Sequence, residues 1–171
     1  MIKLDSSGPV LYKQDRIGEN NTTFTIRKFR SMHYDAEKDS GPVWATDEDP
    51  RITRIGAWLR RFRLDEIPQL INVIKGEMSI VGPRPERPFF IDKLMQEFPF
   101  YYRRHKVRPG ITGWSQIKQP YDMDIDDVRK KLKYDFYYIE NLSFSLDIKI
   151  LASTFWAVSY THLRAHETEA D

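Results

Sequence analysis

Two runs of β-forming residues open the chain and predict a β-hairpin. Residues 9–18 and 22–29 are rich in Val, Tyr, Ile, Thr and Phe. The short segment between them contains Asn20 and Asn21, a residue type that favours tight turns. The next stretch, residues 35–51, is dense in Asp, Ser, Gly and Pro, which predicts a surface loop.

Beyond this loop the apolar positions change to helical spacing. They are Ile55, Trp58, Leu59 and Phe62. This spacing predicts a helix that starts at Thr53 and ends near Leu64. Asp65 is predicted to cap a second helix that runs to Gly76, because Pro68 is tolerated in a first turn and apolar residues recur after it.

The second half of the chain alternates predicted loops and helices. Pro83 and Pro85 cannot lie in a helix interior and predict a stiff loop over residues 79–88. Residues 108–114 form another predicted loop, whose two glycines permit close approach of the backbone to a ligand. Further helices are predicted over residues 89–98, 126–141 and 145–158, the last of them markedly apolar.

Together these elements predict one α+β domain, mainly helical with a small β-hairpin. A length of 171 residues allows a single domain with a hydrophobic core. The composition, 40% hydrophobic and 30% charged, is typical of globular proteins. The chain has no Cys, which excludes disulfides, thiolate metal sites and cysteine nucleophiles. It also has no apolar run of the roughly 18 residues that a transmembrane helix needs.

The charge is unevenly distributed, although the formal net charge is only +2. Residues 51–108 carry 13 Lys and Arg against 6 Asp and Glu, a local balance of +7, whereas both flanking segments are net acidic. A concentrated basic segment indicates an anionic partner, which could be a nucleotide, a phospholipid surface or a nucleic acid.

Asp65 and Glu66 form the first candidate site. Guanidinium groups such as that of the nearby Arg60 match phosphate oxygens, and carboxylates can bind Mg²⁺ or attack an electrophilic phosphorus. A helix N-terminus is expected to keep Asp65 ionised. On spacing alone the more common arrangement is a plain helix cap, with Glu66 as a partner of the helix dipole.

Two basic segments are further candidates. Pro83 and Pro85 would hold Arg84 in one direction, which suits the binding of an anion, but a rigid turn with a solvated arginine fits the pattern equally well. Residues 101–114 combine basic and aromatic side chains, as a nucleic-acid-binding surface can. His105 within this segment is expected to be solvated or structural rather than catalytic.

His162 and His166 have the spacing of metal ligands on a helix. The sequence offers no third ligand nearby, and residues 160–168 look like translated sequencing-adaptor read-through. We therefore expect no metal site here. Residues 159–171 are interpreted as an adaptor-derived tail, outside a catalytic domain of residues 1–158.

The segments described above and their order resemble the bacterial sugar transferase family, the monotopic polyprenyl-phosphate hexose-1-phosphate transferases. The resemblance covers residues 3–158. It rests on the segments 3–10, 14–18, 28–32, 64–70, 72–85 and 108–116. So many ordered segments favour a functional site over the separate structural explanations.

The resemblance implies a membrane-associated catalytic domain that transfers sugar-1-phosphate from a UDP-sugar to polyprenyl (undecaprenyl) phosphate and releases UMP. This is the first step of exopolysaccharide, capsule or O-antigen assembly. Asp65 would be the nucleophile that forms a covalent aspartyl-phosphosugar intermediate, and Glu66 would bind Mg²⁺. The residues that would bind phosphate or nucleotide are Arg60, Pro83, Arg84, Pro85 and Arg108.

The resemblance also implies partners and a location. The partners are the UDP-sugar, polyprenyl phosphate and the membrane surface, at the cytoplasmic face of the bacterial inner membrane; nucleic acid is not among them, and a homo-oligomer is left open. Family members carry an apolar re-entrant membrane helix before the segment that starts at Lys3, and this chain is expected to lack it. Residues 139–157 are a candidate membrane-facing stretch, with ordinary core packing as the alternative. No residue is diagnostic of one sugar.

Two other classes of protein stay open as alternatives. The basic middle segment and its aromatic residues fit a nucleic-acid-binding module. The same segment together with the apolar last helix fits a non-catalytic peripheral membrane protein.

Overall fold

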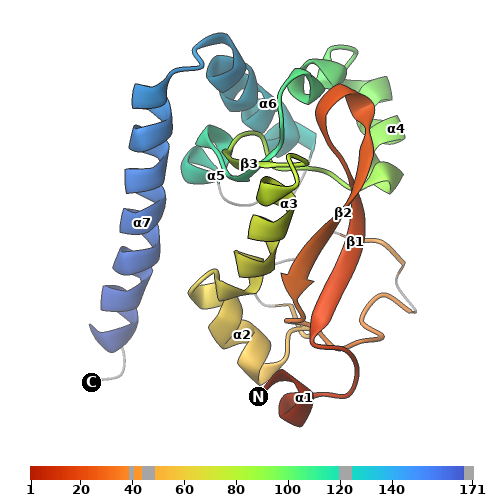
Figure 1. The fold of residues 1–171 in the computed structure, drawn as a ribbon, viewed down its shortest axis with the longest axis vertical. Helices are drawn as coiled ribbons and strands as arrows, with labels where there is room; N and C mark the ends of the chain where they lie inside the picture. The colour runs from red at the N-terminus through yellow and green to blue at the C-terminus, as the bar shows by residue number, and fades with distance from the viewer. Residues whose placement is uncertain (39–40, 44–48, 120–124, 168–171) are drawn as a thin grey trace.

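Figure 1 shows the fold as a computed structural model, which describes residues 1–38, 41–43, 49–119 and 125–167. The side chains of residues 125 and 158–167 are not described, so the pair His162 and His166 and the predicted tail from residue 159 lie outside the described side chains. In these residues the strands form one antiparallel and one parallel pair, and most of the other elements are helices. The prediction of an α+β fold that is mainly helical is confirmed.

The predicted hairpin is present. Strands β1 (Leu11–Ile17) and β2 (Thr23–Phe29) pair antiparallel along their whole length. The chain reverses through a short 3₁₀ helix, η1 (Glu19–Asn21). Asn20 and Asn21 have φ angles of 54° and 59°, a left-handed conformation that Asn adopts more readily than most residues.

Helix α2 (Arg54–Arg61) confirms the helix predicted from Thr53. The Thr53 hydroxyl accepts a backbone N–H of the first turn at 2.9 Å, as a helix cap does. The short N-terminal helix α1 (Ile2–Asp5) is fixed against the same end of α2, because Asp5 Oδ2 accepts the Ile55 N–H at 2.9 Å.

The second predicted helix begins differently from the prediction. After α2 the chain turns at Arg63, which has a left-handed φ of 53°, and enters a 3₁₀ helix, η2 (Leu64–Gln69), which continues into α3 (Leu70–Ile74). The prediction that Asp65 is the helix cap is wrong. The sharp reversal places the cap two residues earlier, and the Glu66 N–H bonds to the Arg63 carbonyl at 3.2 Å to close the first turn.

Two short strands lie within the segments predicted as loops. β3 (Ser79–Val81) pairs parallel with β4 (Gly110–Thr112). The loop prediction is wrong at these positions, because a three-residue strand forms only when a partner distant in the sequence supplies its hydrogen bonds. Residues 83–87 lack regular secondary structure, as predicted.

Gly110 makes this strand pairing possible. A Cβ atom on Gly110 would lie 2.1 Å from the Gly82 nitrogen, and one on Gly113 would lie 2.2 Å from the Gly82 carbonyl oxygen. The close approach expected of these glycines is therefore made to another segment of the backbone.

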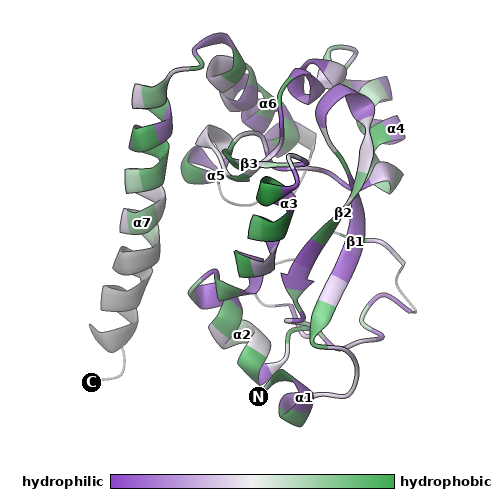
Figure 2. Ribbon diagram, viewed as in Figure 1, coloured by the Kyte–Doolittle hydropathy of each residue, from purple (hydrophilic) through white to green (hydrophobic). Residues whose placement is uncertain are grey.

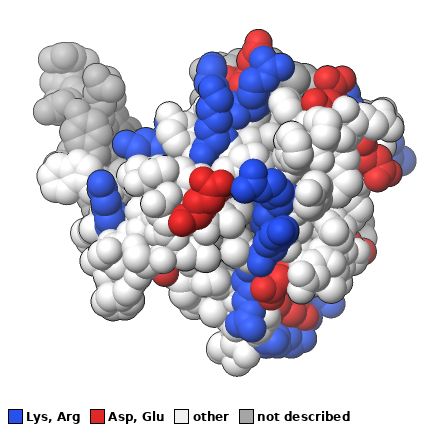
Figure 3. Space-filling model, turned by 90° about the horizontal axis from the view of Figure 1, so that it is seen from above, with Lys and Arg blue, Asp and Glu red and all other residues white. Residues whose placement is uncertain are grey.

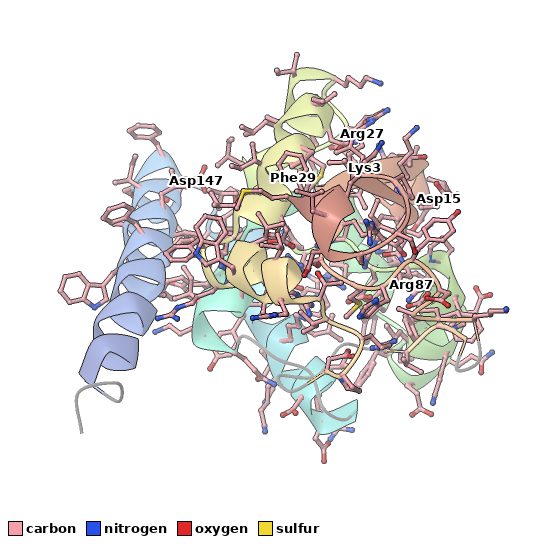
Figure 4. The ribbon with its side chains drawn as sticks, turned by 90° about the horizontal axis from the view of Figure 1, so that it is seen from below. Lys3, Asp15, Arg27, Phe29, Arg87 and Asp147 are labelled. Atoms are coloured by element: carbon pink, nitrogen blue, oxygen red, sulfur yellow. The ribbon has the colours of Figure 1, made fainter. Side chains whose placement is uncertain are left out.

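The remaining helices include three that were predicted. These are α4 (Pro88–Glu97), α6 (Ile125–Glu140) and α7 (Phe144–Glu167), the last of which extends beyond its predicted end. Two short helices were not predicted, η3 (Tyr101–Lys106) and α5 (Trp114–Lys118). Arg87, labelled in Figure 4, fixes the start of α4 to the described part of the 35–51 loop through its ion pair with Glu37 at 2.6 Å.

Among the described residues, most of the buried apolar side chains fall into three small clusters. The first joins α4, η3 and α6 through Ile91, Leu94, Tyr101, Val128 and Leu132. The second places β2 on the segment after α3 through Phe24, Ile26 and Met78. The third places α7 on β3 and α6 through Val81, Tyr138 and Ile150. The second cluster matters most for the candidate site, since it packs β2 on the segment after α3, and β2 also contacts η2.

Helix α7 stands beside the rest of the molecule in Figure 1. Ile150 is fully buried against the body, whereas Phe155 and Trp156 are 76% and 71% exposed. The stretch 139–157 is thus neither all core nor all exposed apolar surface. No helix in the described part of the chain is long and apolar enough to cross a bilayer.

Candidate active site

Asp65 and Glu66 lie side by side on η2, and both are buried. Three basic groups surround Glu66. Its Oε1 atom is 3.0 Å from Lys28 Nζ and 2.8 Å from an Arg84 guanidinium nitrogen, and its Oε2 atom is 3.9 Å from the Arg63 guanidinium. These cations come from β2, from the loop after β3 and from the turn before η2, so three distinct segments meet at one carboxylate.

This arrangement determines the protonation state of Glu66. Burial alone raises the pKa of a carboxyl group, but the charges of Arg84 and Lys28, together with their hydrogen bonds, lower the pKa of Glu66 well below its ordinary value. Glu66 is therefore held as a carboxylate. In return, its charge raises the pKa of Arg84.

The pKa of Asp65 is shifted in the opposite direction. Burial raises the pKa of Asp65 above its ordinary value, the neighbouring Glu66 charge raises it further, and Lys28, Arg60 and Arg84 only partly offset this. None of the hydrogen bonds found among the described residues involves the Asp65 carboxylate. A helix N-terminus was expected to keep Asp65 ionised; in the structure, burial is the main influence on this carboxyl group, and it shifts the pKa upward.

The loop of Pro83, Arg84 and Pro85 lies next to the acidic pair. Both prolines are buried, and the Arg84 side chain reaches across to Glu66. The solvated arginine considered as an alternative is therefore not what the structure has. Arg84 instead links the loop after β3 to the acidic pair on η2.

Lys28 is a member of this site that the interpretation of single motifs did not select. It lies in the 28–32 segment that contributed to the family resemblance, and on β2 it points to η2. Burial lowers the pKa of Lys28, while the Glu66 charge opposes this shift. The sequence around Lys28 does not mark it as a site residue, because only the contact of β2 with η2 brings it to the carboxylates.

Arg60 and Arg108 differ in their relation to the acidic pair. Arg60 lies in the last turn of α2, and its charge lowers the pKa of Asp65, which places it near that carboxylate. Arg108 is exposed and forms an ion pair with Glu19 at 3.5 Å. Within the described residues no ion pair joins Arg108 to either carboxylate of the acidic pair.

His105 is structural in this fold, as expected. It is buried, and its Nδ1–H donates to the Asn21 Oδ1 atom at 2.6 Å, which ties η3 to the hairpin turn. Burial and the charge of Arg104 lower the pKa of His105 to about 4. It is therefore a neutral imidazole near pH 7.

The acidic pair also suits a hard cation. Glu66 Oε2 is buried and has no hydrogen-bond partner among the described residues. No group of three or more His, Asp or Glu side chains that could enclose a metal occurs in the described part of the chain. Mg²⁺ needs no such group, because it is commonly held by one or two carboxylates while substrate phosphates and water complete its coordination. Glu66 Oε2 and the adjacent Asp65 therefore fit Mg²⁺.

The surface charge around the molecule is mixed. Figure 3 shows Lys and Arg side chains in a band across one face, with Asp and Glu side chains between them. A uniform basic track, as a nucleic-acid-binding surface typically has, is not seen on this face. The basic residues of the site point inward to Glu66.

Comparison with known proteins finds extended similarity. Residues 1–161 match the sequence model of the family described as "Bacterial sugar transferase". The "UDP-N-acetylgalactosamine-undecaprenyl-phosphate N-acetylgalactosaminephosphotransferase" of Aeromonas hydrophila is 50% identical over 154 residues, which cover 90% of this chain and 36% of that protein. The "Undecaprenyl-phosphate glucose phosphotransferase" of Komagataeibacter xylinus is 46% identical over 161 residues, 90% of this chain and 30% of that protein.

A shorter relative is matched over most of its length. The "Exopolysaccharide production protein PSS" of Rhizobium leguminosarum bv. phaseoli is 43% identical over 163 residues, 90% of this chain and 80% of that protein. The chain spans about a third of the length of the first two relatives.

Proposed function

Because this chain belongs to the bacterial sugar transferase family, we propose that it is the catalytic domain of an enzyme that transfers sugar-1-phosphate from a UDP-sugar to undecaprenyl phosphate. Names of its relatives support the lipid phosphate as acceptor and, in one case, the UDP-sugar as donor. The relatives differ in their sugar, N-acetylgalactosamine in one and glucose in another, so the sugar stays open. The relative from Rhizobium supports a role in exopolysaccharide production.

The observation that carries the proposal is the difference between the surroundings of Asp65 and those of Glu66. Glu66 is neutralised by Lys28 and Arg84, whereas Asp65 makes no ion pair with a described residue and has a raised pKa. A carboxylate of higher basicity is the better nucleophile, and the surrounding cations can stabilise the charge of an incoming diphosphate. Asp65 is therefore the nucleophile in our proposal, and Glu66 is not.

The reaction has two displacements at one phosphorus. In the first, an Asp65 oxygen bonds to the sugar-bearing phosphorus of the UDP-sugar, the bond from that phosphorus to the bridging oxygen breaks, and UMP leaves with that oxygen. In the second, a phosphate oxygen of the lipid attacks the same phosphorus and the bond to Asp65 breaks. The products are a sugar diphospholipid and the regenerated carboxylate.

The basic residues bind and orient the donor. Arg84, held between two prolines, and Arg60, near Asp65, are placed to bind the phosphates. Lys28 keeps Glu66 ionised and so available to Mg²⁺ at its second oxygen. When bound, Mg²⁺ would neutralise diphosphate charge and lower the barrier to attack by an anionic nucleophile.

An apolar surface next to Asp65 suits a lipid acceptor. Ile67, Leu70, Ile71 and Ile74 follow Asp65 on η2 and α3, and they are 48%, 44%, 45% and 86% exposed. In Figure 2 α3 is largely green, the colour of hydrophobic residues. We propose that this surface rests on the cytoplasmic face of the bacterial inner membrane, so that the lipid phosphate reaches Asp65 from the bilayer.

Replacement of Asp65 tests the proposal. We expect Asp65→Asn to lower the rate of UMP release by at least about 10³-fold, since an amide cannot form the covalent intermediate. The matched control is Asp92→Asn, at an exposed position on α4, which should release UMP at the wild-type rate. UMP is measured with the purified protein, undecaprenyl phosphate, Mg²⁺ and a panel of UDP-sugars.

Trapping of the intermediate completes this test. Without acceptor, a donor radiolabelled in the sugar should leave label on the wild-type protein and on Asp92→Asn, but not on Asp65→Asn. Wild-type rates of UMP release from Asp65→Asn would contradict the covalent role.

A further inference from the structure

The loop that carries Arg84 is held at every carbonyl oxygen from residue 83 to residue 86. The acceptor and donor pairs are Pro83 O with Gly110 N at 3.0 Å, Arg84 O with the Arg104 guanidinium at 2.8 Å, Pro85 O with the Arg16 guanidinium at 3.0 Å and Glu86 O with Ile17 N at 2.9 Å. Two of these four donors are backbone groups. The other two are arginine side chains from separate elements.

The hydrogen bond to the Arg84 carbonyl has a specific consequence. Proline rings fix the φ angles of residues 83 and 85, and the residue before a proline is itself restricted. Once these angles are restricted, the orientation of the Arg84 carbonyl fixes the backbone conformation of Arg84. The backbone conformation in turn fixes the direction in which the side chain leaves the loop. A donor that holds this carbonyl thereby helps to aim the Arg84 guanidinium at Glu66.

Arg104 is itself fixed in place. A guanidinium nitrogen lies 2.8 Å from Asp135 Oδ2, and both side chains are almost fully buried, at 4% and 2% exposed. Asp135 is held in turn by the Ser115 hydroxyl, which donates to Oδ1 at 2.6 Å. Arg104 also donates to the Tyr101 hydroxyl. The guanidinium therefore has little freedom to follow the loop if the loop moves.

Stability alone gives no reason for this buried pair. Replacement of a buried ion pair by apolar residues of similar volume is often neutral or stabilising, because two charges must be removed from water to form it. We propose that Arg104 is a positioning residue: fixed by Asp135, it holds the Arg84 carbonyl so that the Arg84 side chain meets Glu66 and the donor diphosphate. This inference rests on the proposed function of Arg84 as a phosphate-binding residue.

The main test removes both charges at once. Arg104→Met with Asp135→Leu removes both members of the buried ion pair, so that neither is left without the other, and it removes the donor to the Arg84 carbonyl. The matched control is Arg103→Met with Glu140→Leu. This neighbouring pair also joins η3 to α6, at 2.9 Å, but its side chains are exposed, and among the described residues no hydrogen bond joins them to the loop.

We expect the Arg104/Asp135 double variant to lose about 10²-fold in kcat, the cost typical of a misplaced reactive group, with its Tm within about 5 °C of the wild type. The control variant should keep its kcat. In the background of Arg84→Met, the same double change should cost less than about threefold, because a residue that acts only through Arg84 has nothing left to position. Equal losses in both backgrounds, or no loss in the wild-type background, would overturn the inference.

A second variant covers the case in which the double variant does not fold. Arg104→Lys keeps a positive charge beside Asp135 but lacks the planar guanidinium, in which one nitrogen contacts Asp135 and the Arg84 carbonyl while the other donates to the Tyr101 hydroxyl and fixes the orientation of the group. It should show the same selective loss of kcat and the same dependence on Arg84. Full activity of a folded Arg104→Lys protein would contradict the positioning role.

A measurement without turnover separates this inference from the proposed function. The guanidinium protons of Arg84 should exchange slowly with water in the wild type, where Arg84 pairs with Glu66. They should exchange at least about tenfold faster in the Arg104 variants, as followed by NMR of ¹⁵N-arginine-labelled protein. If the wild type releases no UMP, the proposed function fails, but unchanged Arg84 exchange in the variants is what would refute the positioning role.

Discussion

Asp65 and Glu66 are neighbours in the chain and are almost equally buried, at 7% and 6% exposed, yet their carboxylates are in different electrostatic states. Glu66 has two close cationic partners, and their attraction outweighs the cost of burial. Asp65 has the same cations only at a longer range, so burial raises its pKa. Two adjacent residues of similar chemistry thereby become suited to different roles.

Lys28 is expected to be essential to this difference. Lys28→Met should lower the rate of UMP release by about 10²-fold, because Glu66 loses one of its two close cations and the donor phosphates lose a nearby positive charge. Lys13→Met is the matched control, since Lys13 lies exposed on the other strand of the same hairpin. Equal rates for the two variants would contradict a role for Lys28 in the site.

The buried neutral state of His105 predicts a pH dependence of stability. Burial lowers the pKa of His105 from 6.5 to about 4, so in this pH range the unfolded chain binds a proton that the folded protein does not bind. The stabilising contribution is complete above pH 6.5 and is lost as the pH falls towards 4. The loss from this group amounts to about 3 kcal/mol in unfolding free energy.

Urea unfolding at a series of pH values from about 7.5 to about 4.5 measures this dependence. His105→Gln retains a group that can donate to Asn21 but does not titrate, so its unfolding free energy should fall less steeply between about pH 6.5 and about pH 4.5. Parallel curves for the two proteins would show that His105 does not titrate as inferred.

At the scale of elements, the short pair β3 and β4 determines where the Arg84 loop leaves the sheet. The two strands pair over three residues each, and Gly110 then donates its N–H to Pro83 O at 3.0 Å. The strand pairing and the first anchor of the loop thus share one residue. A substitution at Gly110 should therefore affect both the position of the Arg84 loop and the stability of the strand pair.

Gly110→Ala is expected to destabilise the protein by about 3 kcal/mol or more, because the added Cβ would lie 2.1 Å from the Gly82 nitrogen. Gly76→Ala is the comparison. Gly76 has a φ of +76°, but no atom lies within 4 Å of the position that a Cβ would take, so the cost is only the backbone strain of about 1–2 kcal/mol. Thermal unfolding and UMP release distinguish the two, and similar losses in both would contradict the close backbone contact.

At the scale of the whole molecule, the site and the apolar surface lie on the same helices. η2 carries the acidic pair and Ile67, and α3 continues with the exposed Leu70, Ile71 and Ile74. The side of η2 that carries the carboxylates contacts β2, so the hairpin supplies the positive charge of Lys28, while the exposed side is left for a partner. A charged side and an exposed apolar side on the same helices suit an enzyme with one water-soluble and one lipid substrate.

Vesicle binding tests the proposed membrane surface. Ile71→Glu and Ile74→Glu should each lower binding to vesicles of phosphatidylethanolamine and phosphatidylglycerol by about tenfold, since each removes an apolar side chain worth roughly 1.5–3 kcal/mol when buried. Phe89→Glu on α4, at a residue that is 65% exposed, is the control and should bind like the wild type. Co-sedimentation measures the binding, and equal effects at all three positions would argue against a specific surface.

The sequence by itself determined the elements that depend on local chemistry. The hairpin follows from β-forming runs around two asparagines, α2 from its apolar spacing, and the stiff loop from its two prolines. The ordered motifs also indicated the family correctly. In each case the information lies within a few neighbouring residues, where propensity and spacing act.

Only the tertiary structure decided what depends on distant segments. The strands β3 and β4 form because each supplies hydrogen bonds to the other. Lys28 reaches the acidic pair because β2 packs beside it. Arg104 bonds to the Arg84 carbonyl although the two residues are 20 positions apart in the chain. The opposite pKa shifts of the two carboxyl groups follow from burial and from cations on other elements. Charge interactions depend on distance in space and on the exclusion of water, and neither quantity is present in the order of residues.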